Sequence, residues 1–312
     1  MKYSKVLSIA HRVCPRLSGG AVGFTSKEEM VRATTRSLSV ALSRFNGKVR
    51  LFIILDGCPS YRTFISQSFA NCANVEMEFE ETPAIGNAAT YARQCEMLRR
   101  EASSDYVYFS EDDYVYHEDA FAAMADFLDW HGDFVTPLDH PDRYVNGTDN
   151  NAGNTNKASD LQKEAICVSK FRHWRTAANT CCTFMTTFRV LNEAYRIISS
   201  YGRGTSDYTM WEGLTKRLVL RPSKVIPPFL AYLLRMERPY EYYMPVCVWK
   251  YCGLDLLRTP KYTLWQPIRT LAVHLARKSI SPHSEEILRP YVPLEQRNVV
   301  NDIGARYVFG DG

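Results

Sequence analysis

Hydrophobic and polar positions follow two repeats in the first half of the chain, one typical of strands and one typical of helices. Residues 48–57, KVRLFIILDG, form a continuous apolar run that ends in Asp-Gly, as expected for a parallel strand buried on both faces. Residues 26–45 carry apolar side chains at helical spacing behind Ser26, an N-cap candidate. The alternation predicts further strands over 5–11, 74–81, 105–110 and 132–139, and further helices over 60–70, 87–102 and 118–131.

This order of elements predicts the fold class. Strands that alternate with helices form a mostly parallel sheet with helices on both faces, which is an α/β architecture. After residue 140 the pattern changes. Residues 140–160 are rich in Asn, Gly, Asp and Thr and predict a long loop. Residues 171–202 predict a polar loop, a strand and a helix, and residues 205–220 predict one more helix.

The last part of the chain is rich in Pro and Tyr and predicts short helices. We therefore expect a core over residues 1–225 and a C-terminal extension over residues 226–312 that packs on the core and contributes to the active site. Within the extension, PPFLAYLLRMERPY (residues 227–240) fits an interfacial amphipathic helix with Arg235 and Arg238 at its polar edge. A buried core helix is the interpretation that we favour for it.

Composition narrows the class of protein. The chain has 312 residues, is 46% hydrophobic and carries a net charge of +4, which is too small to indicate a dedicated nucleic-acid binder. No apolar run is long enough to span a membrane. The nine cysteines form no Cys-x-x-Cys pair, so we expect reduced, mostly buried thiols in a cytoplasmic protein.

Acidic residues follow two of the buried strands. Asp56 ends one strand, and Glu111, Asp112 and Asp113 end another. In open α/β sheets, ligands bind outside the carboxyl ends of the strands. Carboxylates in that place suit Mg²⁺ or Mn²⁺, which bind one or two protein carboxylates and leave their other positions to water and substrate phosphate. The rival interpretation is a solvated acidic turn.

Several blocks in chain order resemble one enzyme family. VRLFIILDG, IGNAATYARQC and SSDYVYFSEDDYVYHEDAF resemble a GT-A glycosyltransferase of the family 2 type, in which acids after the central strand form a DXD-like motif, here as EDD. DFVTPLDHPDRY, HWRTAANTCCTF, SDYTMWEGL and QPIRTLAVHLARKSISPH continue the series. The resemblance covers roughly residues 5–283 and implies a GT-A fold, a Rossmann-like α/β sheet.

The resemblance assigns roles around the acids. Asp113 would be the direct metal ligand, and His274 would be a second ligand that arrives from the C-terminal extension. Glu111 and Asp112 would face the nucleotide sugar or the water shell of the metal, and Asp56 would contact the base or ribose. For His274, a core histidine is the rival interpretation.

Further roles follow from the later blocks. Asp207 would be the general base that takes the proton of the acceptor hydroxyl, with Glu212 in reserve. Arg175 would contact the diphosphate or the acceptor, Trp174 would stack on a sugar, and Arg93 would reach phosphate. Ordinary packing is the rival interpretation for Trp174, and a favourable charge in the first helical turn is the rival for Asp207.

The implied activity is metal-dependent transfer of a sugar, with inversion, from a nucleotide-diphosphate donor to a hydroxyl acceptor such as a glycan or a lipid-linked glycan. Mn²⁺ or Mg²⁺ would be the cofactor. Peripheral membrane contact and a DNA acceptor stay open. So do three alternatives: a retaining GT-A enzyme, a sugar-nucleotidyltransferase, and a carbohydrate-binding protein on a degenerate GT-A fold. Two departures from the family pattern, HRVCPRLSGG after the first strand and the long spacing from Gly86 to Arg93, leave the donor undefined.

Overall fold

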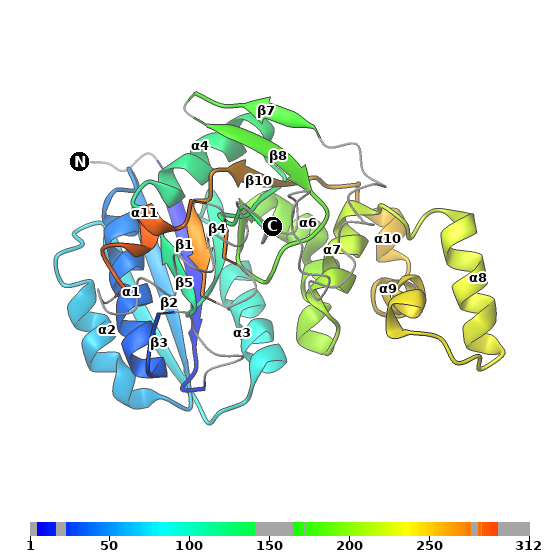
Figure 1. The fold of residues 1–312 in the computed structure, drawn as a ribbon, viewed down its shortest axis with the longest axis horizontal. Coiled ribbons are helices and arrows are strands. Elements are labelled where there is room, and N and C mark those ends of the chain that lie inside the picture. The colour runs from blue at the N-terminus through cyan, green and yellow to red at the C-terminus, as the bar shows by residue number, and fades with distance from the viewer. Residues whose placement is uncertain are drawn as a thin grey trace, which may run out of the picture.

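The computed structural model shows a central sheet between two layers of helices (Figure 1). The predicted loop over residues 140–160 lies outside the described residues, apart from His140. The description covers residues 5–16, 23–140, 165–170, 172–275, 280–281 and 283–292.

Nine described strands make up the central sheet, in the order β3-β2-β1-β4-β9-β6-β10-β8-β7. Only β9 and β8 run against the other seven. The expected mostly parallel sheet is therefore confirmed. The strands are β1 (Val6–Val13), β2 (Lys48–Asp56), β3 (Val75–Thr82), β4 (Tyr106–Glu111), β6 (Phe134–Val135), β7 (Ile166–Val168), β8 (His173–Ala177), β9 (Phe184–Thr187) and β10 (Leu264–Ile268).

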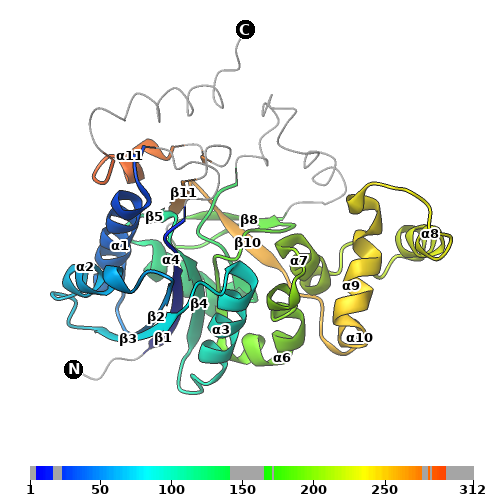
Figure 2. The ribbon, with the colours of Figure 1, turned by 90° about the horizontal axis from the view of Figure 1, so that it is seen from below.

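Helices cover both faces of the sheet, as predicted (Figure 2). Helices α1, α2 and α4 lie on one face, while α3, α6 and α7 lie on the other. The described helices are α1 (Lys27–Ser43), α2 (Arg62–Ser68), α3 (Asn87–Arg99), α4 (Ala120–His131), α6 (Phe188–Ile198), α7 (Asp207–Thr215), α8 (Pro222–Leu233), α9 (Met244–Cys252), α10 (Asp255–Arg258) and α11 (Glu285–Leu288), with short 3₁₀ turns η1 (Pro59–Tyr61), η3 (Tyr201–Arg203) and η4 (Tyr240–Tyr243).

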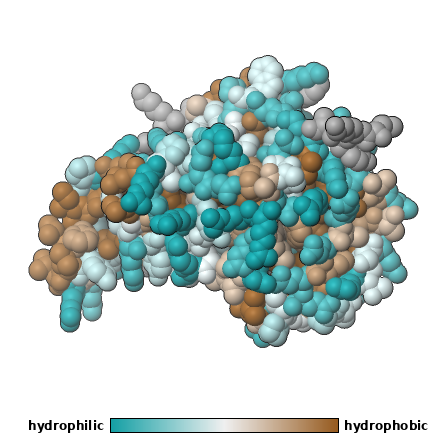
Figure 3. All heavy atoms as spheres, turned by 180° about the vertical axis from the view of Figure 1, so that it is seen from behind, coloured by the Kyte–Doolittle hydropathy of each residue, from teal (hydrophilic) through white to brown (hydrophobic). Residues whose placement is uncertain are grey.

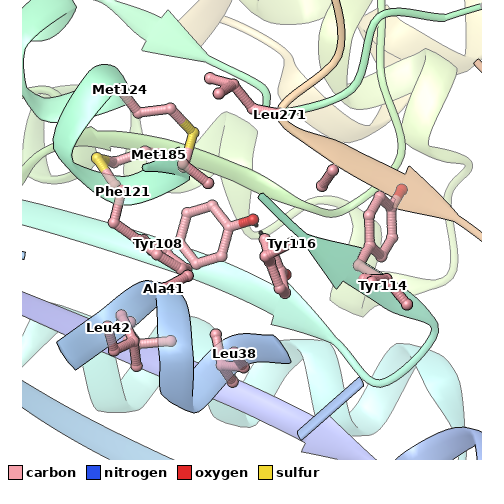
Figure 4. Packing of buried hydrophobic residues seen from close by; sticks show 14 of the residues in the cluster. Leu38, Ala41, Leu42, Tyr108, Tyr114, Tyr116, Phe121, Met124, Met185 and Leu271 are labelled. Atoms are coloured by element: carbon pink, nitrogen blue, oxygen red, sulfur yellow. Dashed lines mark hydrogen bonds between the residues drawn. The ribbon is translucent and has the colours of Figure 1, made fainter. Parts of the chain in front are cut away.

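The first four residues of strand β4, 106–109, are all hydrophobic because both faces of the strand are covered. Tyr106 and Tyr108 enter the hydrophobic core under α1 and α4, whereas Val107 and Phe109 enter the core under α3 and α6. Successive side chains of a strand point to opposite faces, so a strand with helices on both sides has no polar face. Figure 4 shows Tyr108 directed toward Tyr116, whose hydroxyl accepts its hydrogen bond at 3.2 Å.

A second, two-stranded sheet follows directly after the acidic triplet. Strand β5 (Tyr114–Tyr116) pairs antiparallel with β11 (Ala272–His274), and the register sets Tyr114 opposite His274. The sequence pattern predicted neither strand, because three residues are too few to show a repeat. This pairing returns the C-terminal part of the chain to the acidic residues.

The C-terminal part contributes more than short helices. Strand β10 is inserted in the central sheet between β6 and β8, so the sheet itself crosses the predicted boundary at residue 225. That division of the chain stays a prediction. The expectation of a buried core helix over residues 227–240 is wrong, because α8 buries only Pro228 and Ala231.

Other expectations concern chemistry rather than topology. All nine cysteines are free thiols, four of them buried and five partly buried. No helix in the described part of the chain has the length and apolar character needed to cross a membrane.

Candidate active site

A cavity of about 440 Å³ opens at the carboxyl ends of β1, β2 and β4. This is the edge of the sheet where the sequence predicted a ligand site. Asp56 and all three acids of the triplet line it, together with residues that sequence analysis did not single out. The most relevant of the latter are Arg12, Cys14, Arg16, Lys27, Asn87 and Thr90.

Glu111 is tied to the strand beside it. Its Oε1 accepts a hydrogen bond of 2.5 Å from Nη2 of Arg12, and its Oε2 accepts one of 2.9 Å from the hydroxyl of Thr183. Arg12 and Glu111 are partners in the parallel register of β1 and β4, which places both side chains at the same edge. Arg12 also donates to the carbonyl of Asn87 at 2.9 Å. Both carboxylate oxygens of Glu111 are therefore occupied.

Asp112 is tied to the helix above it. Lys27, the first residue of α1, donates to its Oδ1 at 2.7 Å, and the backbone N–H of Cys14 donates to its Oδ2 at 2.9 Å. Burial of the carboxylate raises the pKa of Asp112 and outweighs the opposing effect of Lys27. Since the ion pair is buried on both sides, it is screened little by solvent.

Asp113 is tied to the C-terminal part of the chain. Its Oδ2 lies 3.1 Å from Nε2 of His274, and the imidazole of His274 stacks on Tyr114 with ring centroids 4.7 Å apart. Burial alone would raise the pKa of Asp113, but His274, Lys27 and Arg12 together hold it below its usual range. Its Oδ1 is buried and has no hydrogen-bond partner among the described residues.

The three acids are therefore not equivalent, because each has a partner from a different element. Arg12 of β1 pairs with Glu111, Lys27 of α1 pairs with Asp112, and His274 of β11 contacts Asp113. A solvated turn is excluded, because the Asp112 residue is only 6% exposed. Among the three acids, only Asp113 keeps a carboxylate oxygen without a hydrogen-bond partner in the described part of the chain.

Asp56 holds the loop that follows β3. Its Oδ1 accepts hydrogen bonds from the Thr82 hydroxyl at 2.7 Å and from the Ile85 N–H at 2.6 Å, and its Oδ2 accepts one of 2.9 Å from the Gly86 N–H. Gly86 in turn is the N-cap of α3, whose first residues line the cavity. The carboxylate thus positions a wall of the cavity, and a contact with a base or ribose stays a prediction.

Asp207 does not line the cavity. It is the first residue of α7, behind the N-cap Ser206, whose hydroxyl accepts a hydrogen bond of 3.2 Å from the Thr209 N–H. Burial raises the pKa of Asp207, and the negative charge of Glu111 raises it further, while His140 opposes the shift. The structure therefore places Asp207 within electrostatic reach of Glu111.

Two residues of the strand β8 are placed differently from the expectation. Trp174 is fully buried, stacks on Phe127 with centroids 4.4 Å apart, and donates to the Ser169 hydroxyl at 3.0 Å. It packs in the core, so the sugar-stacking role is wrong. Arg175 donates to Asp139 Oδ1 at 2.8 Å in a buried ion pair and does not line the cavity.

Arg93 and Glu212 also lie outside the cavity. Arg93 bridges Glu80 and Glu96 on the outer surface of α3, at 2.7 and 2.8 Å. Glu212 is buried and accepts hydrogen bonds from the backbone N–H groups of residues 218 and 219, which lie in the segment that follows α7. Phosphate contact by Arg93 and a reserve role as base for Glu212 therefore have no support in the geometry.

The side chains of Asp113 and His274 fit a small divalent cation. Two metal–ligand bonds of about 2.1 Å at right angles place the donor atoms about 3.0 Å apart. Oδ2 of Asp113 and Nε2 of His274 are 3.1 Å apart. The free Oδ1 of Asp113 gives a further lone pair. No three His, Cys, Asp or Glu side chains of the described residues are grouped as a metal site. The protein would thus supply two ligands, as Mg²⁺ sites that also bind substrate phosphate often do.

Sequence reasoning missed the cations Arg12 and Lys27. Arg12 is visible as the only charged residue inside the first apolar strand, and Lys27 follows an N-cap serine. Neither feature predicts which acid each cation pairs with, because the pairing depends on the register of β1 on β4 and on the packing of α1.

Comparisons with known proteins give distant structural likenesses. No protein-family model and no curated protein sequence matches the chain. A structure of S. aureus TarS spanning residues 1–349 is 12% identical, with 100% of this chain and 92% of that chain covered and a TM-score of 0.42. The 4-diphosphocytidyl-2C-methyl-D-erythritol synthase of Anaerococcus prevotii is 9% identical, with 93% and 96% covered and a TM-score of 0.39.

A nucleotide-diphospho-sugar transferase of Desulfovibrio desulfuricans, described as putative, is 11% identical, with 44% of this chain and 58% of that chain covered and a TM-score of 0.30. With identities below 25% and TM-scores below 0.5, the activity of this chain has to be argued from its own site.

Proposed function

We propose that the protein is a metal-dependent glycosyltransferase that uses a nucleotide-diphosphate sugar. The observation that carries the proposal is a cavity at the carboxyl edge of a parallel sheet that is lined by Asp113, by the exposed Arg16 and by the open N-terminus of α3. His274 contacts Asp113 from outside the cavity lining. The GT-A resemblance of the sequence points to the same place. The proposal includes Asp113 and His274 as metal ligands.

The phosphate contacts come from two features of the cavity. Gly86 caps α3 without a side-chain hydrogen bond, so the first N–H groups of this 13-residue helix are available to an anion. Arg16 lines the same cavity and is exposed, with no ion pair recorded among the described residues. Together they suit a diphosphate, whose remaining charge a bound Mn²⁺ or Mg²⁺ would neutralise.

The remaining groups order the site and move a proton. Arg12 and Lys27 hold the carboxylates of Glu111 and Asp112 in place through ion pairs, which fixes the backbone that carries Asp113. Asp207, whose pKa burial raises, accepts the proton of the acceptor hydroxyl while the hydroxyl oxygen bonds to the anomeric carbon. The bond from that carbon to the nucleotide diphosphate breaks in the same step, and the nucleotide diphosphate leaves. One displacement of this kind inverts the anomeric configuration. A DNA acceptor has no support in the cavity and stays unassigned.

A panel of nucleotide-diphosphate sugars tests the proposal. We expect one donor to be hydrolysed or transferred in Mn²⁺, with activity lost in EDTA and restored by Mn²⁺. Incubation of a nucleoside triphosphate with sugar 1-phosphates, with pyrophosphate release as the readout, tests the nucleotidyltransferase alternative in parallel. Full donor turnover in EDTA, or pyrophosphate release without sugar transfer, would contradict the proposed function.

A further inference from the structure

Helix α8 carries its apolar residues on the outside of the molecule. Ile226, Phe229, Leu230 and Leu233 are spaced i, i+3, i+4 and i+7, which places them on one face. Their exposed fractions range from 48 to 61%. The opposite face packs on α9 and η4 through small residues, since only Pro228 and Ala231 of the helix are buried.

The patch continues past the end of the helix. Leu234 and Met236 are exposed as well, and Leu234 reaches 73%. Tyr232, within the last turn of the helix, is also exposed. Helix α8 lies at one end of the elongated molecule (Figure 1), and the space-filling view shows apolar residues gathered at that end (Figure 3). Single exposed leucines are ordinary, but a contiguous apolar patch marks an interaction surface.

The segment that carries this patch is basic. Residues 216–261 contain nine lysines and arginines against three acidic residues. Four of these cations, Lys216, Arg217, Arg221 and Lys261, line a cavity of about 670 Å³ at the base of α8. The rest of the lining includes threonines and no acidic side chain. Arg221 is also the N-cap of α8, so the cavity and the apolar face adjoin.

The positive charge beside the apolar patch distinguishes two possible partners, a second copy of the chain and an anionic membrane. In a symmetric dimer, the same patch meets itself, so the basic rim of one copy would face the basic rim of the other. An anionic membrane surface is complementary to both features, because it attracts lysine and arginine and accepts apolar side chains at the boundary between headgroups and acyl chains. Tyrosines flank the helix, as is typical of residues at that boundary.

We propose that α8 and the basic cavity at its base form a surface that docks the protein on an anionic lipid bilayer. The apolar face of α8 enters the boundary region, and the exposed cations of the cavity, Arg221 and Lys261, contact lipid phosphates. The inference stands on the surface alone and does not depend on the proposed glycosyltransferase activity.

Vesicle co-sedimentation of the full chain tests this docking. The probes are phosphatidylcholine vesicles with and without phosphatidylglycerol. One variant combines Phe229→Asp with Leu233→Asp, and a second combines Arg221→Glu with Lys261→Glu. The matched control is Trp130→Asp, which changes another exposed aromatic, 77% exposed, on α4. Thermal melting of each variant reports whether it is folded.

We expect the wild type and Trp130→Asp to sediment with the anionic vesicles, and high salt to release them. Each double variant should bind at least about tenfold more weakly than the wild type. Wild-type protein that stays in the supernatant, or double variants that are folded and bind as the wild type does, would overturn the proposal. So would a dimer that the α8 variants dissociate without vesicle binding, or stabilisation by inorganic phosphate alone with no vesicle binding. If one double variant does not fold, the other decides.

Discussion

Glu111, Asp112 and Asp113 are neighbours in sequence that have separate partners in space. The side chains of Glu111 and Asp112 are both occupied by cations and hydrogen-bond donors of the same chain. Asp113 differs, because one of its carboxylate oxygens is buried without a partner in the described part of the chain. We therefore choose Asp113 as the metal ligand from the contacts that the three acids make in the structure. The sequence of the triplet alone does not reveal these contacts.

Arg12 and Arg93 allow a direct test of which arginine belongs to the site. Arg12→Gln leaves Glu111 charged and partly buried without its partner, which we expect to cost about 3 kcal/mol of stability and to weaken nucleotide binding. Arg93→Gln removes exposed ion pairs, so stability should change by less than about 1 kcal/mol and nucleotide affinity should stay as in the wild type. Denaturant unfolding measures the stability of each variant, and nucleotide titration measures its affinity. An equal effect of the two substitutions on nucleotide affinity would contradict the placement.

Asp207 gives a prediction about pH. A general base works only when deprotonated, and burial raises the pKa of Asp207. The loss of kcat/KM on acidification should thus begin above the usual carboxylate range, which centres at about 3.9 for Asp. Asp207→Asn should remove this limb of the profile and lower kcat by roughly 10²-fold to 10⁴-fold. Asp255→Asn, at the start of α10, is the matched control. An unchanged pH profile in Asp207→Asn would exclude it as the base.

The elements that could be predicted from sequence are those with long patterns. Strand β2 is apolar over most of its nine residues, and α1 carries both an N-cap and a helical repeat, so both were found with nearly correct ends. Strands β5 and β11 have three residues each and exist only because they pair with each other across the chain. Strand β8 contains His173, Arg175 and Thr176, and these polar residues led us to expect a loop. The segment is a strand because its backbone pairs with β10, a partner that lies about 90 residues later in the chain.

In the candidate site too, the residues found from sequence are those placed by local patterns, and the residues missed are those placed by long-range contacts. Asp56 and the triplet were found because their position follows from strand ends, which the local pattern gives. Arg12, Lys27 and the register that brings His274 to Asp113 depend on contacts between residues far apart in the chain. Helix α8 was assigned to the core because its composition is apolar, and composition does not say which side of a helix is covered.

The turn after β2 gives a prediction at the level of an element. Gly57 has a φ of +76°, and a Cβ there would meet the Cβ of Ala84 at 3.0 Å. Gly204 has a φ of +89° with nothing within 4 Å of such a Cβ. Both alanine variants should lose about 1–2 kcal/mol from the positive φ. Gly57→Ala should lose more and should also weaken nucleotide binding, because it displaces the loop that Asp56 holds. Equal melting temperatures and affinities for the two variants would contradict this.

At the scale of the whole molecule, two separate regions have different proposed tasks. The carboxyl edge of β1, β2 and β4 holds the cavity with the acids, and the C-terminal part returns to Asp113 through β11. Helix α8 lies at one end of the molecule, packed on α9 and η4, with its apolar face outward (Figure 1). If both proposals hold, the protein is a nucleotide-sugar enzyme that works at a lipid surface.

Binding of a nucleoside diphosphate in Mn²⁺ tests the central claim most directly. Isothermal titration should show that the wild type binds the diphosphate with Mn²⁺ and loses most of its affinity in EDTA. Asp113→Ala should bind at least about tenfold more weakly, as expected when a direct metal ligand is removed. The matched control Glu118→Ala, an exposed acid just beyond β5, should bind as the wild type does. Binding by Asp113→Ala that equals the wild type in the presence of Mn²⁺ would contradict the account.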